Sequence, residues 1–307
     1  LDKFIDANPD KLKSTTSQDN IYLNKLLVTL RLGLRSVSGL IPPPSAPIPA
    51  DKLADAVVEW HDANHLPAHY RIDGQVAAGY LFSDPDSDQY KEVAGIRDQI
   101  GAVVAKALAY MAKSNEDDVE NIKCLVRLAQ DYVCHYGTDR STCSGLRRAW
   151  NSGLDSLVLD ARECRMPRYF VSKRIMYMQA SRLLHNTRFM SASELISDIT
   201  LKLSKLCLSL YSEVRNHAIA AVDNIMSILP ATKYPLIPHF LAELEEKEDS
   251  DPEKMIGALR VLDTQPLRCV CLRDWRYFPQ LVLALCRAQH EDKPIVKKLI
   301  MNMALTQ

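Results

Sequence analysis

The sequence predicts an all-α protein in which pairs of helices stack as an α-solenoid. Apolar residues recur at steps of three and four along most of the chain, which is the period of a helix with one buried face and not the alternation of a strand. Ten glycines among 307 residues, less than half the usual ~7%, also favour helices. The second helices of the last three expected pairs begin at Glu213, Pro252 and Pro294, at intervals of 39 and 42 residues. These intervals are close to the ~40–47-residue period of helical repeat arrays.

The first 95 residues divide into two parts. We expect residues 1–40 to be the helical end of a preceding repeat, with an amphipathic helix from Asn20 that ends at Gly39. Five prolines between positions 42 and 49 cannot continue a helix, so an extended connector should follow. Residues 41–95 are therefore predicted to be this connector and an irregular helical segment, with one short helix over Asp51–Trp60.

Residues 96–190 should contain one helix pair, a basic segment and a long helix. The pair is expected at Ile96–Met111 and Val119–Val133, on either side of a polar corner. Residues 137–166 are basic and less clearly periodic. The long helix is expected at Pro167–Leu184. Its expected apolar stripe comprises Phe170, Ile175, Met178 and Leu183.

Residues 191–307 should contain three helix pairs, of which Ser191–Leu229 is the clearest. Ser191 with Glu194 three residues later forms a capping-box pattern, and Ser212 is placed to cap the second helix. Pro230 should end that helix. The expected buried stripes are Leu195, Ile199, Leu203, Leu206 and Leu210 in the first helix, and Val214, Ala218, Ala221, Ile225 and Ile228 in the second.

The last two pairs follow the same logic. Tyr234–Glu245 should pair with Pro252–Leu262, where Asp251 is a natural N-cap and proline suits the first helical position. Trp275–Ala288 should pair with Pro294–Ala304. Because a lone helix pair cannot bury both of its faces, each pair should draw stability from its neighbours.

Composition narrows the classes of function. The formal net charge is zero, so bulk electrostatics give no reason to expect direct nucleic-acid binding or membrane binding. No apolar run reaches the ~18 residues needed to span a bilayer. The eight cysteines lie mostly within apolar helical stripes and are expected to be reduced thiols of an intracellular protein.

The sequence predicts no metal site and no catalytic site. Three groups of residues were weighed as metal ligands: His61, His65 and His69; Cys269 and Cys271; Cys134, His135 and Cys143. Pro67 interrupts the helix that would align the first group, and the other two lack paired Cys-x-x-Cys spacing. A surface histidine cluster and structural thiols are the preferred interpretations. No phosphate-binding loop or catalytic motif stands out.

A basic stretch from Arg140 to Arg188 contains ten Lys or Arg and three acidic residues, a formal charge of +7. One interpretation is a surface for an acidic partner or a polyphosphate, because clustered guanidinium groups suit phosphate oxygens. The other, which we favour on sequence grounds, is a solvated face that pairs with acidic neighbours outside this chain. The candidate residues are Arg147, Arg148, Arg162, Arg165, Arg168, Lys173 and Arg174.

Four segments together resemble one protein family. They are Asp117–Val133, Arg165–Phe189, Leu210–Met226 and Lys233–Leu241. In this order they resemble the middle region of the large single-chain HEAT-repeat proteasome activators of the bleomycin-resistance (Blm) type, also called proteasome activator complex subunit 4. The Tyr-Ser-Glu-Val-Arg corner that begins at Tyr211 is similar to the second-helix opening of a HEAT repeat. In such repeats Arg215 would be a structural residue that bonds to the adjacent repeat.

The resemblance implies a non-enzymatic fragment of a superhelical dome. Such a dome caps the α-ring of the core (20S) proteasome, opens its gate without ATP, and admits peptides or unfolded or acetylated proteins. The implied partners are the proteasome α-subunits, acetylated histones and the remaining HEAT repeats of the same parent chain, in the nucleus and cytoplasm and in the DNA-damage response. No cofactor is expected within the fragment, although inositol phosphate is implied for the whole protein. The final residues, Leu305-Thr306-Gln307, lack the family's hydrophobic-Tyr-any docking motif, so we expect that tail elsewhere.

Two other classes of function stay open at this point. One is a different HEAT or armadillo scaffold, of the nuclear transport receptor or phosphatase-scaffold type, which binds protein partners. The other, less favoured, is a helical hydrolase that uses a cysteine or histidine brought together by the tertiary fold.

Overall fold

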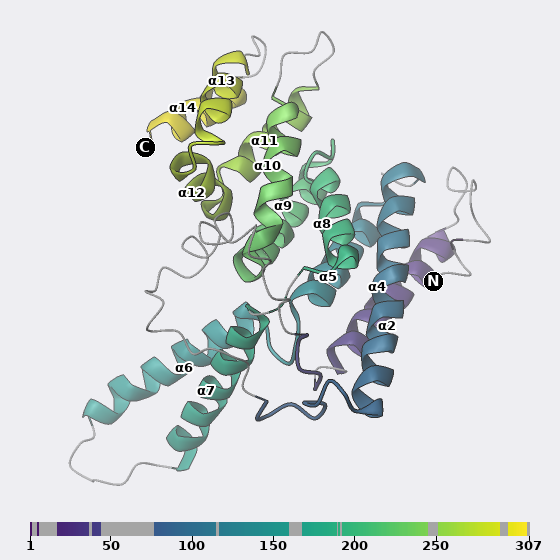
Figure 1. Ribbon diagram of the computed structural model, residues 1–307, viewed down its shortest axis with the longest axis vertical. Coiled ribbons are helices and arrows are strands. Elements are labelled where there is room, and N and C mark those ends of the chain that lie inside the picture. The colour runs from purple at the N-terminus through teal and green to yellow at the C-terminus, as the bar shows by residue number, and fades with distance from the viewer. Residues whose placement is uncertain are drawn as a thin grey trace.

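The chain is all-α in its computed structural model (Figure 1). The structure describes residues 1, 5, 17–36, 39–43, 77–114, 117–159, 168–188, 190, 192–244, 251–288 and 294–305. Over these ranges it contains twelve α-helices, one short 3₁₀ helix and no β-strand beyond an isolated bridge between Leu40 and Phe82.

From α4 to α9 and from α11 to α14 the helices follow one another closely, whereas residues 37–87 separate α2 from α4. Their bounds are α2 Ser17–Ser36, α4 Asp88–Ser114, α5 Val119–Cys134, α6 Arg140–Leu159, α7 Arg168–Thr187, α8 Glu194–Leu206, α9 Ser212–Ile228, η4 Pro230–Thr232, α10 Lys233–Ala242, α11 Pro252–Leu262, α12 Gln265–Arg273, α13 Phe278–Arg287 and α14 Pro294–Leu305.

The helices form two stacked layers, which is the arrangement of a solenoid. In one layer α2, α5, α9, α11 and α14 contact each other in that order. In the other layer α4 packs on α8, and α10 packs on α12 and α13. The consecutive helices α4 and α5, α8 and α9, and α10 and α11 form antiparallel pairs that join the layers (Figure 1). The predicted succession is therefore confirmed for these three pairs. The predicted last pair is not formed in the same way, because α14 packs on α11 whereas α13 packs on α10 and α12.

One continuous apolar core runs through the stack. Leu125 of α5, Ile225 of α9 and Leu259 of α11 are all fully buried, although they belong to three successive pairs. Burying one such side chain contributes about 1.5–3 kcal/mol. Because each pair presents apolar residues to the next, this stabilisation is shared between neighbours.

The helices α6 and α7 form a hairpin that lies, in the sequence, between the pair α4–α5 and the pair α8–α9. They pack mainly on each other and project away from the stack (Figure 1). The sequence predicted no regular helix over 137–166, yet α6 occupies twenty residues of it. Only the base of the hairpin is anchored, where Leu183 is buried and its carbonyl accepts a hydrogen bond from the Tyr80 hydroxyl at 3.5 Å.

This projection corrects the predicted stripe of α7. Leu183 is buried, but Ile175 and Met178 are 62% and 58% exposed. The helical period correctly placed them on one face, but that face is exposed because the main packing partner of α7 among the described helices is α6, on another face.

The predicted cap of α8 was also wrong. The N-cap is Ser193, whose hydroxyl accepts a hydrogen bond from the backbone amide of Ile196 at 3.3 Å. Ser191 lies outside the described residues. The helix ends at Leu206, and Leu210, expected to be buried, is 54% exposed. The reason is that residues 207–211 turn the corner and carry Leu210 out of the helical register.

Most of the remaining boundaries follow the sequence with small shifts. The exception is α4, which begins at Asp88 and not at Ile96, and so takes up part of the segment predicted as connector and irregular helix. Helix α9 has Tyr211 at its N-cap, where the tyrosine side chain does not bond to the helix amides, so Ser212 is the first helical residue and not the cap. Helix α11 has the predicted bounds, and its N-cap Asp251 accepts a hydrogen bond from the Glu253 amide at 2.9 Å. Helix α13 begins at Phe278, three residues after the predicted start, and α12 occupies residues that the sequence assigned to no helix.

The first helix has the predicted length but lies three residues earlier in the chain, from Ser17 and not from Asn20. Helix α2 ends at Ser36 and not at Gly39. The chain then runs beside residues 80–82, where the Phe82 amide donates to the Gly39 carbonyl at 2.9 Å and the Ile41 amide donates to the Phe82 carbonyl at 3.0 Å. The short helix predicted over 51–60 lies outside the described residues.

Candidate functional site

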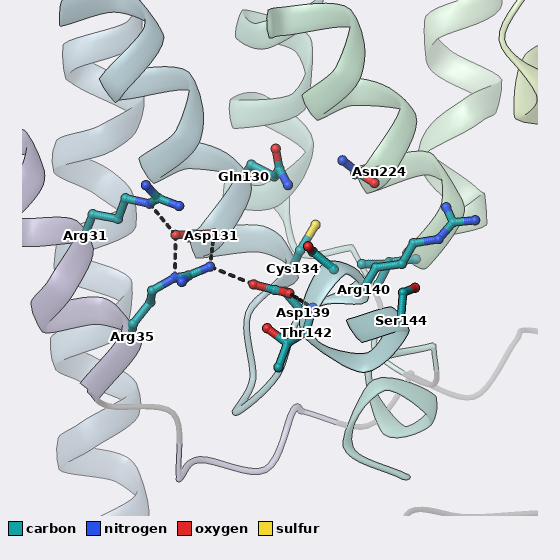
Figure 2. Close-up of a pocket in the computed structure, with 12 residues that line it drawn as sticks. Arg31, Arg35, Gln130, Asp131, Cys134, Asp139, Arg140, Thr142, Ser144 and Asn224 are labelled. Carbon is teal, nitrogen blue, oxygen red and sulfur yellow. Dashed lines mark hydrogen bonds and ion pairs between the residues drawn. The ribbon is translucent and has the colours of Figure 1, made fainter. Parts of the chain in front are cut away.

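A pocket of about 610 Å³ opens where α2, α5, α6 and α9 meet (Figure 2). Polar side chains dominate its lining, and they come from segments about a hundred residues apart in the sequence. The lining residues are Arg31, Arg35, Gln130, Asp131, Cys134, Asp139, Arg140, Ser141, Thr142, Ser144, Asn224 and Ile228.

A network of ion pairs crosses one wall of this pocket (Figure 2). Asp131 accepts hydrogen bonds from the Nε atoms of Arg31 and Arg35, at 2.6 and 2.9 Å. Arg35 also donates through Nη2 to Asp139 at 2.7 Å. The Asp131 side chain is only 7% exposed, whereas both arginines are about one-third exposed. The network thus joins α2, α5 and the start of α6.

Asp139 has a second role as the cap of α6. Its Oδ1 accepts a hydrogen bond from the backbone amide of Thr142 at 2.6 Å. Burial opposes ionisation of Asp139, but the hydrogen bonds from Thr142 and the charge of Arg35 outweigh it, so the pKa of this carboxyl lies below its ordinary value. The carboxylate is therefore charged at neutral pH and fully engaged, which suits a structural role better than acid–base catalysis.

The cysteine and histidine beside the pocket are not poised as a nucleophile and its base. Burial raises the pKa of the Cys134 thiol. Burial, assisted by the charge of Arg35, lowers the pKa of the neighbouring His135. At neutral pH the thiol is protonated and the imidazole is neutral. A thiolate nucleophile needs the opposite shift of the cysteine pKa.

The other residues weighed as metal ligands are dispersed or outside the described chain. Cys143 lies 3.6 Å from the Ser181 hydroxyl, and burial raises the pKa of Cys271 to about 12. In the part of the chain that the structure describes, no three His, Cys, Asp or Glu side chains gather as a metal site. His61, His65 and His69 lie outside it.

Arg215 links two successive helix pairs. Its side chain is 3% exposed, and its Nη2 donates to Glu253 at the start of α11 at 2.8 Å. Its Nη1 donates to the Ser209 carbonyl in the α8–α9 corner at 2.7 Å. The arginine thus connects the second helix of one pair to the second helix of the next. Gly257 allows α11 to lie close to the end of α8, because a Cβ at this position would lie 2.3 Å from the Cys207 carbonyl oxygen.

A second buried arginine was not anticipated from the sequence. Arg97 of α4 is buried and donates to the carbonyls of Tyr132 and His135 at the end of α5. Its guanidinium lies 4.0 Å from the centre of the Tyr136 ring. Carbonyls at a helix C-terminus attract a cation. The sequence did carry a sign that Arg97 is buried: it lies seven residues before Val104, on the same buried face of α4.

The predicted basic residues lie on the projecting hairpin. Arg147 and Arg148 are exposed on α6, and Arg168 and Arg174 are exposed on α7. Lys173 is half-buried, with its Nζ 5.2 Å from the centre of the Tyr169 ring. Arg162 and Arg165 lie outside the described residues. The structure therefore gathers five of the seven candidates on α6 and α7, away from the pocket of Figure 2.

Comparison with known proteins adds no identification. No protein-family model matches the chain, and a search of curated proteins finds no match. Among the helices that the structure describes, none is both long and apolar enough to cross a bilayer.

Proposed function

We propose that this chain is part of a non-enzymatic α-solenoid scaffold, namely an ATP-independent activator that caps the α-ring of the core (20S) proteasome. The whole protein would open the gate of the proteasome and admit peptides or unfolded or acetylated proteins, in the nucleus and cytoplasm. Its partners would be the proteasome α-subunits and the other HEAT repeats of its own chain, with acetylated histones among the substrates.

The observation that carries the proposal is the ordered stacking of α5, α9, α11 and α14. Each step places the second helix of one pair against the second helix of the next, and at one step Arg215 bonds to Glu253 across the junction. Such stacking builds a curved wall without an enclosed active site. It agrees with the resemblance of Asp117–Val133 and Leu210–Met226 to the Blm-type activators.

Exposed apolar side chains at both ends of the stack also support a larger array. Leu32 of α2 and Met301 of α14 are among the exposed large hydrophobic residues of the terminal helices. A solenoid whose end helices expose apolar side chains is incomplete without capping or continuing repeats. Further repeats of the same parent chain are the proposed occupants of these faces.

The polar residues of the pocket suit a structural role. The pocket carboxylates Asp131 and Asp139 are bound by arginines, and the Cys134 thiol has a raised pKa. In this proposal the protein contributes shape and contact surfaces, and the proteasome carries out proteolysis.

Two measurements on the natural full-length protein test the proposal. Affinity purification with quantitative identification of partners should recover core proteasome α-subunits as the main species. The purified protein should also accelerate hydrolysis of a fluorogenic peptide by latent core proteasome without ATP. Recovery of transport factors or phosphatase subunits in place of proteasome would favour the alternative HEAT or armadillo scaffold and overturn the proposal.

A further inference from the structure

The hairpin of α6 and α7 has a surface that the stacking of the solenoid does not use. One face of α7 carries Val171, Ile175 and Met178, all exposed, at positions i, i+4 and i+7. These side chains form a stripe about 10 Å long on one side of the helix. We call Val171, Ile175 and Met178 the α7 stripe.

Cations border the α7 stripe on both sides. With 100° per residue, Arg168 and Arg174 lie about 60° to either side of Val171 around the helix axis. The α7 sequence, Arg168–Thr187, contains no acidic residue. Arg168 is moreover the first residue of the helix, where a cation opposes the helix macrodipole. An acidic ligand at this end would remove that unfavourable interaction.

The charge of the hairpin is not neutralised by the described part of the chain. Over the sequences of α6 and α7 there are seven arginines and lysines and one aspartate. No ion pair within the described residues involves Arg147, Arg148 or Arg168, nor Lys173 or Arg174. Two of these side chains contact aromatic rings, Lys173 on Tyr169 and Arg174 on Trp150, and a ring carries no charge to balance theirs.

The aromatic side chains help to decide what kind of ligand fits. The Phe170 ring packs over Gly153, where an added Cβ would lie 2.3 Å from the ring, and Trp150 lies against Arg174. Apart from Tyr169, the large hydrophobic side chains exposed on α7 are therefore not aromatic: they are Val171, Ile175, Met176 and Met178. Helices that lie in a membrane interface expose Trp and Phe, and binding of single-stranded nucleic acid relies on stacked aromatics. A bare polyphosphate makes no use of an aliphatic stripe.

We infer that the α7 stripe and its flanking arginines bind an acidic amphipathic helix of a partner protein. Apolar anchors at i, i+4 and i+7 match the spacing with which a partner helix packs. Glutamates or aspartates on both sides of the partner's apolar ridge would meet Arg168 and Arg174. The inference goes beyond the proposed function and needs only the solenoid fold, so it stands or falls independently of proteasome binding.

The test uses the 307-residue chain and a fluorescein-labelled helical peptide of leucine, alanine and glutamate, with leucines at heptad positions a and d. Fluorescence anisotropy should show binding that weakens as salt is added. The triple variant Val171→Ser/Ile175→Ser/Met178→Ser should weaken binding by about tenfold or more, because burial of one aliphatic side chain already corresponds to that factor. The double variant Arg168→Glu/Arg174→Glu should weaken it by about tenfold or more, because like charges repel across an interface.

Matched controls separate this surface from general effects. Leu210→Ser removes an equally exposed apolar side chain in the α8–α9 corner, and Lys254→Glu reverses an exposed charge on α11. Both should bind the peptide as the parent chain does, and circular dichroism should show unchanged helix content in all variants. No binding, equal binding of a sequence-scrambled peptide, or full binding by the triple variant would overturn the inference. So would tighter binding of phosphatidylserine vesicles, inositol hexakisphosphate or single-stranded RNA than of the peptide.

Discussion

The junction between α9 and α11 offers the sharpest test of the solenoid interpretation. Arg215 is buried and donates to the Ser209 carbonyl and to Glu253. Replacing it by methionine keeps most of the volume and removes both bonds. The orphaned carbonyl costs about 2 kcal/mol. Glu253 is 30% exposed and can be hydrated once the arginine is gone, so losing this ion pair costs about 1 kcal/mol. We therefore expect Arg215→Met to lose about 3 kcal/mol of unfolding free energy.

Two further variants isolate the pair. Glu253→Gln should cost about 1 kcal/mol. When it is combined with Arg215→Met, the loss should be smaller than the sum by about the same amount. The control is Arg260→Met, which removes a hydrogen bond to Asn216 at the surface of the same two helices and should cost less than about 0.5 kcal/mol.

Urea unfolding followed by circular dichroism measures these losses, and amide hydrogen exchange locates them. Because neighbouring repeats stabilise each other, exchange should accelerate in α10 to α14 and stay unchanged in α4 and α5. If Arg215→Met is no more destabilising than Arg260→Met, the buried arginine does not couple the pairs. The structural argument for the array would then lose its buried polar link between α9 and α11.

Three more predictions concern stability. Gly257→Ala places a methyl group 2.3 Å from the Cys207 carbonyl oxygen and should cost about 2 kcal/mol of unfolding free energy. Gly33→Ala, with no atom within 4 Å of the added methyl group, should stabilise α2 by about 0.5 kcal/mol. Urea unfolding of the two variants measures this difference. Asp131→Asn removes the charge between two guanidinium groups and should cost about 3 kcal/mol in the same assay, and an unchanged midpoint would contradict the network. Burial lowers the pKa of His135 from 6.5, so the unfolded chain takes up the proton first and stability falls as pH drops below about 6.5. His135→Gln should flatten this decline in unfolding measured between about pH 7.5 and 5.5, with part of the slope remaining from two other histidines shifted the same way.

Helix content and pair order could be predicted because both depend on local spacing. In α9, Val214, Ala218, Ala221, Ile225 and Ile228 are all buried as expected. The start of α11 followed from Asp251 and Pro252, since capping and proline placement act within one turn. The cap of α8 was misplaced by two residues because two serines, Ser191 and Ser193, precede that helix, and backbone geometry decides which of them caps it.

The ion-pair network could not be predicted in the same way. Arg31 and Asp131 are a hundred residues apart and meet only because α2 stacks on α5. The basic residues were recognised as a group, but their gathering on a projecting hairpin was not. The glycines of α6, Gly145 and Gly153, and its scattered polar residues weaken the periodic signal from which that helix would be inferred.

Residue spacing along the chain was enough to establish that this protein is made of one-sided helices arranged in pairs, because residues that recur every three or four positions lie on one face of a helix. Which face lacks a neighbour was decided by how the pairs pack. Leu203 and Ile175 both occupy apolar stripes, yet one is fully buried between pairs and the other is exposed on α7. The difference arises from partners distant in sequence, since burial depends on what packs against a face and not on the face alone.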